Sequence, residues 1–384
     1  MTVLWAIIVI IAIFTALTLY RNLAVLQYRL VPPPPDKDDA HELVLVTIPA
    51  RNEASNIRDC VQSVLGQAYR PLQIIAVNDN STDATGAILA EMAAGSPELE
   101  IIQGKPLPPG WAGKNYAISQ GVAGARGRWL VFMDADTRLS PDAIGRAVAL
   151  MRQRDLAMLS YLPRHILGSF WEKVVQPVVM GYVLSGAPPS MTEDPKSGTA
   201  AAFGQFVVFD RTAYDRIGGH EGVKGEVLED WRMAQKIKAE GLRLGMAEGQ
   251  DLSSVRMYTS LAGLWEGWTK NAFLGADKRL DLLALLLFTV FVLGIWPVVL
   301  AIWAVVAAIS GASGVLPLAI AAVYQLGIML YYATWMNRRM RMPASNAIGF
   351  PLGSIIFEGI LVNSAYRVLS GRGVSWKGRT YSDQ

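Results

Sequence analysis

Two carboxylates separated by one residue follow an apolar run in the middle of the chain. The run is Trp129 to Met133, and the carboxylates are Asp134 and Asp136. A short apolar run bounded by polar residues is typical of a strand buried on both faces. In open α/β sheets, ligands bind at the carboxyl ends of such strands. Two oxygen ligands at that edge suit Mg²⁺ or Mn²⁺ carrying a diphosphate, so we expect a metal site there.

The same spacing occurs a second time, at Asp36 and Asp38. That copy follows four consecutive prolines and is typical of a solvated linker. In a chain of this length about one such triplet is expected by chance, so the triplet alone is weak evidence. Only Asp134 and Asp136 follow a buried-strand pattern, and only they are interpreted as metal ligands.

Acidic residues also follow the two strands expected earlier in the chain. Glu53 lies after residues 43–48, and Asp79 and Asp83 lie after residues 74–77. Each of these loops alone is equally compatible with a solvated turn or a helix cap. Together with the central pair they form a polar crescent on one sheet edge, which suits a nucleotide. Carboxylates accept hydrogen bonds from a base and a ribose, and a metal neutralises a diphosphate.

A glycine-rich loop, Gly110 to Asn115, resembles a phosphate-binding loop. It is not a Walker A motif, which needs glycine where Pro108 stands and serine or threonine where Asn115 stands. It can still bring Lys114 and the first amides of a helix close to a phosphate. The alternative is a lysine on a solvated helix face.

A second pair of acidic residues, Glu229 and Asp230, opens a helix after the glycine-rich loop 218–225. The helix dipole favours acidic residues in a first turn, which is a purely structural explanation. The functional interpretation is a general base at the border of a flexible loop, which typically contributes about 10²–10⁴ in rate.

Strands and helices alternate through this part of the chain. Strands are expected at 43–48, 74–77, 100–102, 129–133 and 205–209, and helices at 53–67, 112–125, 141–154 and 229–240. Ser81 or Thr82 is expected to cap the helix after the second strand. This alternation predicts an α/β, doubly wound sheet built largely from parallel strands.

The composition indicates a membrane protein that carries a soluble domain. Hydrophobic residues make up 52% of the 384 residues and charged residues only 17%, with the apolar excess gathered in segments. The net charge is +3 without a dense basic tract, so no nucleic-acid partner is expected. Cys60 is the single cysteine and there are three histidines, which argues against disulfides and a histidine-rich zinc site.

The first 20 residues carry no charge and are long enough to cross a bilayer. A signal peptide is the alternative, but a basic start and a small-residue cleavage site are missing. Arg21 and Arg29 follow, which places the next domain in the cytoplasm. The proline-rich linker within 22–42 is expected to act as a semi-rigid spacer.

The chain again lacks charge from Leu282 to Asn337, which predicts a hairpin of two spans, 282–309 and 315–336, with an external turn. Residues 347–366 fit either a full crossing or a re-entrant or interfacial helix, and we prefer the latter. A crossing would put Lys377 and Arg379 outside the cell.

Two further apolar segments lie between the soluble domain and the hairpin. Residues 170–185 are broken at Pro177 and are expected to lie on the membrane surface. Residues 256–281 form an amphipathic interface helix with Trp265 and Trp268. Tryptophans at helical spacing are more often core residues or interface anchors than substrate platforms.

Taken in order, four of these motifs resemble family 2 inverting glycosyltransferases of the GT-A fold. The motifs are 49–53 (PARNE), 77–83 (VNDNSTD), 134–136 (DAD) and 229–230 (ED), and the resemblance covers about 43–275. The stretch 106–114 (PLPPGWAGK), followed by a membrane-spanning tail, looks most like the hopanoid- and carotenoid-associated branch. Ceramide glucosyltransferases are similar in layout.

This resemblance implies a nucleotide-diphospho-sugar transferase with a doubly wound mixed sheet and transmembrane helices at both ends. It assigns the base to Asp230 beside Glu229 and the metal, Mg²⁺ or Mn²⁺, to Asp136 and Asp134. Nucleotide contacts are expected from Pro49, Arg51, Glu53, Asp79 and Asp134, and diphosphate or acceptor contacts from Lys114, Trp111, Gly113, Gln205, Trp265 and Trp268.

The predicted organisation is an anchor (1–21), a linker (22–42), a cytoplasmic catalytic domain (43–255), an interface helix (256–281), a transmembrane hairpin (282–337) and a basic tail with a membrane-contacting helix (338–384). The predicted location is the cell membrane, with several spans.

The predicted function is inverting transfer of one sugar from a nucleotide-diphosphate sugar, with a uridine donor preferred, to a hydroxyl of a lipid acceptor of hopanoid, carotenoid, sphingolipid or polyprenyl type. Processive relatives carry a Gln-x-x-Arg-Trp motif that residues 265–270 lack, which favours single-sugar transfer. The alternative is an inactive membrane scaffold or nucleotide-sugar-binding protein, but none of the expected carboxylates is missing. A transporter is disfavoured, because Glu358 is the one ionisable residue inside the apolar segments.

Overall fold

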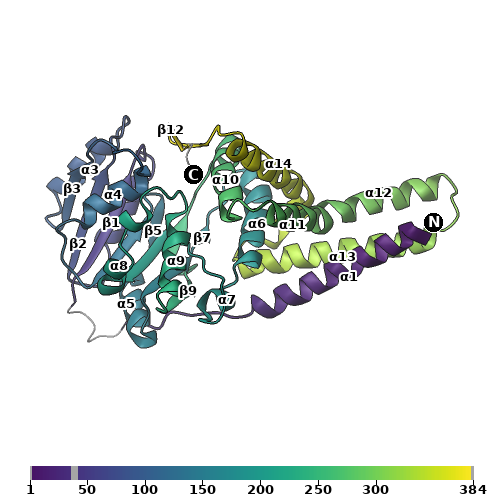
Figure 1. Ribbon diagram of the computed structural model, residues 1–384, viewed down its shortest axis with the longest axis horizontal. Coiled ribbons are helices and arrows are strands. Elements are labelled where there is room, and N and C mark those ends of the chain that lie inside the picture. Colours follow the sequence, from purple (N-terminus) through teal and green to yellow (C-terminus); the bar gives the residue numbers. More distant parts are fainter. Residues whose placement is uncertain (1, 36–41, 382–384) are drawn as a thin grey trace.

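The computed structural model describes residues 2–35 and 42–381, and it combines an α/β domain with a projection of long helices (Figure 1). The alternative acidic pair Asp36 and Asp38 lies outside the described residues. The central sheet has seven strands in the order β3-β2-β1-β4-β8-β6-β9. Their bounds are β1 Val44–Ala50, β2 Leu72–Asn78, β3 Leu99–Gln103, β4 Trp129–Met133, β6 Met158–Leu162, β8 Phe206–Asp210 and β9 Leu244–Glu248.

The sheet is mixed, as predicted. Strands β1 to β4 are parallel, β8 runs antiparallel to β4 and β6, and β6 pairs with β9 in parallel. The parallel register brings Ala50 opposite Asn78, and Thr47 opposite Phe132. The loops that carry Glu53, Asp79 and Asp134 therefore leave the sheet at one edge.

Helices cover both faces of the sheet, because the strand side chains alternate in direction. Val44, Val46 and Ile48 pack against one layer, and Leu45 packs against the other. The first layer contains α2 (Ile57–Leu65), α3 (Thr85–Ala94) and α5 (Ala143–Arg154), and the second contains α4 (Gly113–Val122), α8 (Arg211–Arg216) and α9 (Glu229–Ala239). The single cysteine, Cys60, is buried in α2.

A small second sheet, β5-β10-β7, lies beside the main one. It consists of β5 (Thr137–Leu139), β7 (Arg164–His165) and β10 (Ser253–Val255). These short strands, together with β6 and β9, were not expected from the sequence. The short helix α7 (Pro189–Glu193) and the 3₁₀ turn at Glu221–Val223 complete this half of the domain.

Two local predictions were wrong. Ser81 and Thr82 do not cap α3; instead, the Asp83 carboxylate accepts a hydrogen bond of 2.9 Å from the Thr85 amide. Helix α6 (Phe170–Gly186) continues through Pro177 without a break, and most of its residues are buried. Helix α6 packs against α10 (Leu261–Gly275), α13 and α14, so tertiary packing outweighs the roughly 3 kcal/mol cost of an internal proline.

The described part of the linker is packed on the α/β domain and is not a free spacer. Arg146 donates hydrogen bonds to the carbonyl oxygens of Pro32 and Pro33, at 2.6 and 3.0 Å. The Leu30 carbonyl accepts a hydrogen bond of 2.8 Å from the Glu248 amide. These bonds fix the direction in which the chain leaves the first helix.

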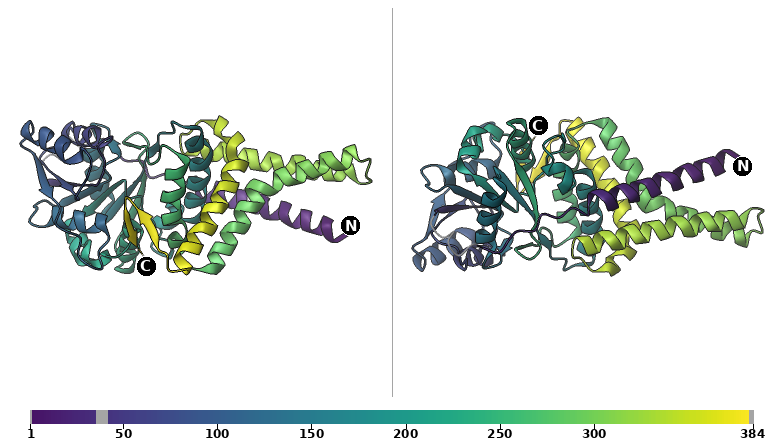
Figure 2. Two further views of the ribbon diagram at one scale, coloured as in Figure 1. Left: turned by 90° about the horizontal axis from the view of Figure 1, so that it is seen from above. Right: turned by 90° about the horizontal axis from the view of Figure 1, so that it is seen from below.

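Within the described residues, four helical segments are long and apolar enough to cross a membrane: Trp5–Val25, Leu280–Ile309, Val315–Arg339 and Ala344–Leu369. Helices α1 (Thr2–Val25), α12 (Trp296–Ile309) and α13 (Val315–Arg339) project away from the α/β domain, whereas α11 (Leu280–Val290) and α14 (Phe350–Leu369) run across the base of this projection (Figure 2). A π-helical turn at Phe291–Ile295 lies between α11 and α12, where the direction changes.

The base of the projection is tied to the α/β domain by one buried cation. Arg339, at the end of α13, forms an ion pair of 2.5 Å with Glu248 of β9. Its Nε also donates a hydrogen bond of 3.0 Å to the carbonyl oxygen of Leu26. The Arg339 side chain is only 3% exposed, so both contacts are shielded from water.

We predict that Arg339→Met lowers the melting temperature of the detergent-solubilised protein by several degrees. Removing one partner of a buried ion pair leaves Glu248 uncompensated, which typically costs about 3–5 kcal/mol. The neighbouring Arg338 is exposed, and Arg338→Met is the matched control with an expected change near zero. Equal melting temperatures for the two variants would contradict this role of Arg339.

Candidate active site

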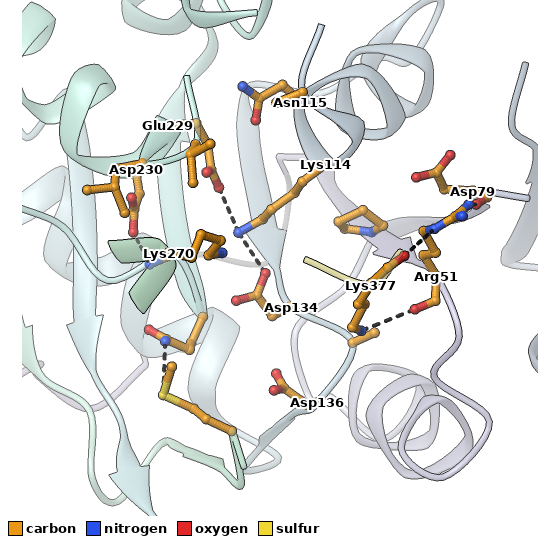
Figure 3. A pocket seen from close by; sticks show the side chains of 18 of the residues that line it. Arg51, Asp79, Lys114, Asn115, Asp134, Asp136, Glu229, Asp230, Lys270 and Lys377 are labelled. Atoms are coloured by element: carbon orange, nitrogen blue, oxygen red, sulfur yellow. Dashed lines mark hydrogen bonds and ion pairs between the residues drawn. The ribbon is translucent and has the colours of Figure 1, made fainter. Parts of the chain in front are cut away.

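A cavity of about 210 Å³ opens at the sheet edge where β1, β2 and β4 end (Figure 3). Ten of the predicted site residues line it: Pro49, Arg51, Glu53, Asp79, Lys114, Asp134, Asp136, Gln205, Glu229 and Asp230. They come from distant parts of the chain, and the parallel strands and α9 bring them together.

Lys114 connects two of the acidic groups in the cavity. Its Nζ lies 2.7 Å from Asp134 Oδ1, after β4, and 2.7 Å from Glu229 Oε1, at the start of α9. Burial lowers the pKa of Lys114, but Asp134, Glu229 and Asp230 outweigh it and raise that pKa well above its ordinary value. Lys114 is therefore a permanent cation. Through its two ion pairs it links α4 to the end of β4 and to the start of α9. Figure 3 shows it between the two carboxylates.

Asp230 is fixed by backbone amides. The Gly204 amide donates to Oδ2 at 2.7 Å, and the Trp231 amide donates to Oδ1 at 2.9 Å. Burial, followed by the charge of Glu229, raises the pKa of Asp230 to about 7. A side chain at position 204 would have its Cβ 3.0 Å from Lys114 Nζ and 3.1 Å from Asp230 Oδ2, so glycine keeps this approach open. The geometry and the pKa suit a general base.

Asp136 has a buried carboxylate oxygen, Oδ1, without a hydrogen-bond partner among the described residues. Burial, and then the charges of Asp134 and Glu53, raise the pKa of Asp136 to about 8. A carboxylate whose pKa is raised by neighbouring carboxylates at a cavity edge favours a cation beside it. The described residues contain no group of three or more metal-ligating side chains, so further ligands would have to come from substrate and water.

Four of the sequence-predicted residues do not line the cavity. The Trp111 ring packs edge-on against Tyr116, and Trp265 packs against Gly359 of α14. Trp268 is 7% exposed and donates a hydrogen bond of 3.0 Å to Gln176. These tryptophans make packing contacts within the protein, and their role in acceptor binding stays a prediction. Gly113 lies just behind the cavity wall, at the first turn of α4.

The sequence interpretation missed several residues of this cavity. They are Asn115, Gly204, Glu226, Met257, Tyr258, Lys270, Asn271, Lys377 and Arg379. Asn115 appeared in the sequence only as a departure from a phosphate loop, yet its amide donates to the carbonyl oxygens of Val223 and Glu226 at 2.8 and 2.9 Å. It therefore fastens the loop that precedes Glu229.

Lys377 and Arg379 are the least expected of these residues. Lys377 forms an ion pair with Glu53 and donates a hydrogen bond of 3.1 Å to the Arg51 carbonyl oxygen. Arg379 forms a two-pronged ion pair with Asp79, in which Nη2 lies 2.9 Å from Oδ1. The sequence had suggested only that both are basic residues after a membrane-contacting helix.

Comparison with known proteins agrees with this geometry. Residues 45–218 match the family model described as Glycosyl transferase family 2. The 4,4'-diaponeurosporenoate glycosyltransferases of Staphylococcus aureus strains MRSA252 and USA300 are each 27% identical to this chain, over 89% of this chain and 89% of theirs. The chain contains a family 2 glycosyltransferase domain.

The solved structures agree at the level of the fold. A mannosyltransferase from Pyrobaculum calidifontis, in complex with GDP-Man and Mn²⁺, aligns over 94% of this chain and 99% of its own, with a TM-score of 0.57 and 20% identity. The predicted GT-A type of fold is thereby confirmed. The family match and the glycosyltransferase relatives support the predicted resemblance and identify the protein as a glycosyltransferase. An inactive scaffold is the less favoured reading.

We predict that Lys114→Met destabilises this glycosyltransferase more at pH 8 than at pH 6. Without the cation, Asp134, Glu229 and Asp230 repel one another while ionised, at a cost of about 1–3 kcal/mol. Protonation of Asp230, whose pKa is raised to about 7, relieves part of this repulsion, so the melting-temperature deficit should shrink as the pH falls. Lys105→Met is the control, because Lys105 is exposed and does not line the cavity. A deficit independent of pH would contradict the bridging role.

Proposed function

We propose that this glycosyltransferase transfers one sugar from a nucleotide-diphosphate sugar to a hydroxyl of a membrane lipid, with inversion at the anomeric carbon. The observation that carries the proposal is Asp230, a carboxylate oriented by two backbone amides in the same cavity as Asp134 and Asp136. A base on one side and an acidic metal-binding pair on the other suit a single in-line displacement.

The donor half of the cavity is supported by Glu53, Asp79 and Arg51. Their carboxylates and backbone lie where β1 and β2 end, next to Asp134. Carboxylates at this edge suit the hydrogen-bond donors of a base and a ribose. The Pyrobaculum protein was solved with GDP-Man, and a uridine donor is our preference for this chain.

Asp134 and Asp136 are the residues that would hold a divalent metal. The unpartnered Oδ1 of Asp136 and the chemistry of two carboxylate donors fit Mg²⁺ or Mn²⁺. When bound, such a metal neutralises the charge that develops on the departing diphosphate. Lys114 pairs with Asp134 from the other side and also holds Glu229.

Asp230 would remove the proton from the acceptor hydroxyl as the bond to the sugar forms. It needs to be ionised for this, and its amide partners hold the carboxylate in one orientation toward the cavity. Groups that set its charge face it from three elements: Glu229 on α9, Lys114 on α4 and Asp134 after β4. Proton transfer of this kind contributes about 10²–10⁴ in rate.

The lipid acceptor is supported by the elements around the acceptor side of the cavity. Lys270 and Asn271 of α10 line it, and α10 packs on α14 and α6. Apolar side chains on the projecting helices, including Ile10, Leu17, Ile302, Ile309 and Val323, are largely exposed and suit contact with lipid. The Staphylococcus relatives are named for a carotenoid-type acceptor, which is compatible with a long apolar substrate.

We predict that Asp230→Asn lowers sugar transfer at least about 100-fold, because the amide cannot accept the proton. The assay incubates purified protein with membrane lipids and a panel of nucleotide sugars, and follows the gain of one sugar mass by mass spectrometry. Asp215→Asn, on the exposed surface of α8, is the matched control and should retain full activity. Full transfer by Asp230→Asn would refute the assignment of the base.

We predict further that kcat/KM of the wild-type protein rises with pH through about 7, since Asp230 is protonated and inactive below its raised pKa. The profile is measured between pH 5.5 and 8.5 with a saturating lipid acceptor and a limiting donor, using about half-unit steps. A profile that falls over this range would show that the essential group acts as an acid.

The membrane arrangement is part of the same proposal: α1, α12 and α13 cross the bilayer, α11 and α14 lie at its cytoplasmic interface, and the catalytic domain is cytoplasmic. The turn at Gly311–Gly314 would then lie outside. Return of the chain to the cavity after α14, through Lys377 and Arg379, supports an interfacial α14. The predicted domain boundaries remain proposals.

We predict that a cysteine at Ser313 reacts with a membrane-impermeant maleimide in intact cells, whereas a cysteine at Glu100 reacts only after permeabilisation. Glu100 lies exposed on β3 of the catalytic domain, so it reports the opposite side. The natural Cys60 is buried and gives little background. Labelling of both positions in intact cells, or of Glu100 alone, would contradict the topology.

A further inference from the structure

The last described segment of the chain forms a small hairpin over the donor half of the cavity. Strands β11 (Val374–Trp376) and β12 (Arg379–Tyr381) pair antiparallel and are joined by Lys377 and Gly378. Both turn residues have positive φ, 46° and 76°, as a two-residue hairpin turn requires. The turn therefore holds Lys377 at the tip, with Arg379 directly after it.

Both cations of the hairpin point into the cavity and pair with the carboxylates expected to bind the nucleoside. Lys377 meets Glu53, and Arg379 meets Asp79 (Figure 3 labels Lys377, Asp79 and Arg51). The Arg379 guanidinium lies against the first turn of α4, where a Cβ on Gly113 would be 1.8 Å from its Nη1. Glycine at 113 is therefore required for Arg379 to reach this position.

The charge of the cavity explains why these cations matter. Among the described residues, seven carboxylates line it: Glu53, Asp79, Asp134, Asp136, Glu226, Glu229 and Asp230. Five cations accompany them: Arg51, Lys114, Lys270, Lys377 and Arg379. Two of the five come from the hairpin. Without them the cavity would repel a diphosphate strongly, because a low-dielectric wall strengthens repulsion between like charges.

Two of the other three cations, Lys114 and Arg51, are less suited to meet a diphosphate. Lys114 is already shared between Asp134 and Glu229, and Arg51 donates to the carbonyl oxygens of Asp79 and Asn80 at 2.8 and 3.2 Å. Lys377 and Arg379 are carried by a short hairpin that contacts α10 and α14 through β11. Side chains on such a hairpin can exchange their ion-pair partners at a lower free-energy cost than side chains of the central sheet.

We propose that Lys377 and Arg379 bind the diphosphate of the nucleotide-sugar donor, and that they exchange Glu53 and Asp79 for the phosphate oxygens when the donor enters. The exchange frees both carboxylates for the nucleoside at the moment when the phosphates arrive. Guanidinium and ammonium groups bind phosphate through charge-assisted hydrogen bonds, and arginine can do so with two parallel bonds. The inference rests on the proposed nucleotide-sugar donor.

The proposal is tested by comparing nucleoside diphosphates with their nucleosides. Binding of UDP, GDP, uridine and guanosine is measured by calorimetry on the full chain in detergent with Mn²⁺, for wild type, Lys377→Met, Arg379→Met and the double variant. The double variant should lose diphosphate affinity by on the order of 10- to 100-fold, while nucleoside affinity stays constant or increases. If the hairpin had only a structural role, the substitutions would change both affinities alike, and the ratio of diphosphate to nucleoside affinity would stay constant.

Arg372→Met is the matched control. Arg372 carries the same charge a few residues earlier, is exposed and lies over the Tyr366 ring at 5.2 Å, away from the cavity. It should leave the ratio unchanged. Arg379→Lys keeps the charge and should recover part of the diphosphate affinity, and melting temperatures verify that every variant is folded.

Three outcomes would overturn the proposal, each in a different way. An unchanged ratio in the double variant would mean that the hairpin does not meet the diphosphate. A higher diphosphate affinity in the double variant would mean that the hairpin only occludes the site. If the folded wild-type protein binds none of the four compounds, the proposed donor class fails and the inference fails with it.

Discussion

The position of Lys114 is the constraint on which the rest of the site depends. Its ammonium group joins the end of β4 to the start of α9 through two contacts of 2.7 Å. Three carboxylates would otherwise face one another in a partly buried space, where their mutual repulsion is weakly screened. Because Lys114 neutralises part of this charge, Asp230 can lie beside Glu229 with its carboxylate aimed at the cavity. The absence of a side chain at Gly204 provides the space for this arrangement.

Much of the sheet could be predicted from the sequence, because β1, β2 and β4 are largely apolar runs followed by acidic loops. The prediction of Asp134, Asp136, Glu53 and Asp79 at one edge followed from parallel strands alone. The strands β6 and β9 were missed, although every residue of β6 is buried, since periodicity does not separate a short buried strand from a loop in the core. The break predicted at Pro177 was also wrong. The tertiary packing around α6 outweighs the local tendency of proline to interrupt a helix.

The C-terminal part of the site could not be predicted, because a local sequence pattern does not show which distant part of the fold a later segment will contact. Lys377 and Arg379 follow an apolar helix, and basic residues in such a place are usually membrane-flanking charges. Their partners Glu53 and Asp79 are about 300 residues earlier in the chain. Lys377-Gly378 is compatible with a two-residue hairpin turn, and Gly113 with a close approach of another segment to α4. Neither feature identifies its partner until the hairpin and α4 are placed together.

The return of the chain also connects the two sides of the cavity that we propose for the donor and the acceptor. Helix α14 packs on α6, α10 and α11 at the base of the projecting helices, and the hairpin that follows it reaches the donor carboxylates. Lys270 and Asn271 of α10 line the same cavity from the other side. A shift of α14 or α10 on contact with a lipid would therefore displace Lys377 and Arg379, because the hairpin packs on both helices. By reciprocity, a donor that draws these cations away from Glu53 and Asp79 would bias the helices that meet the acceptor.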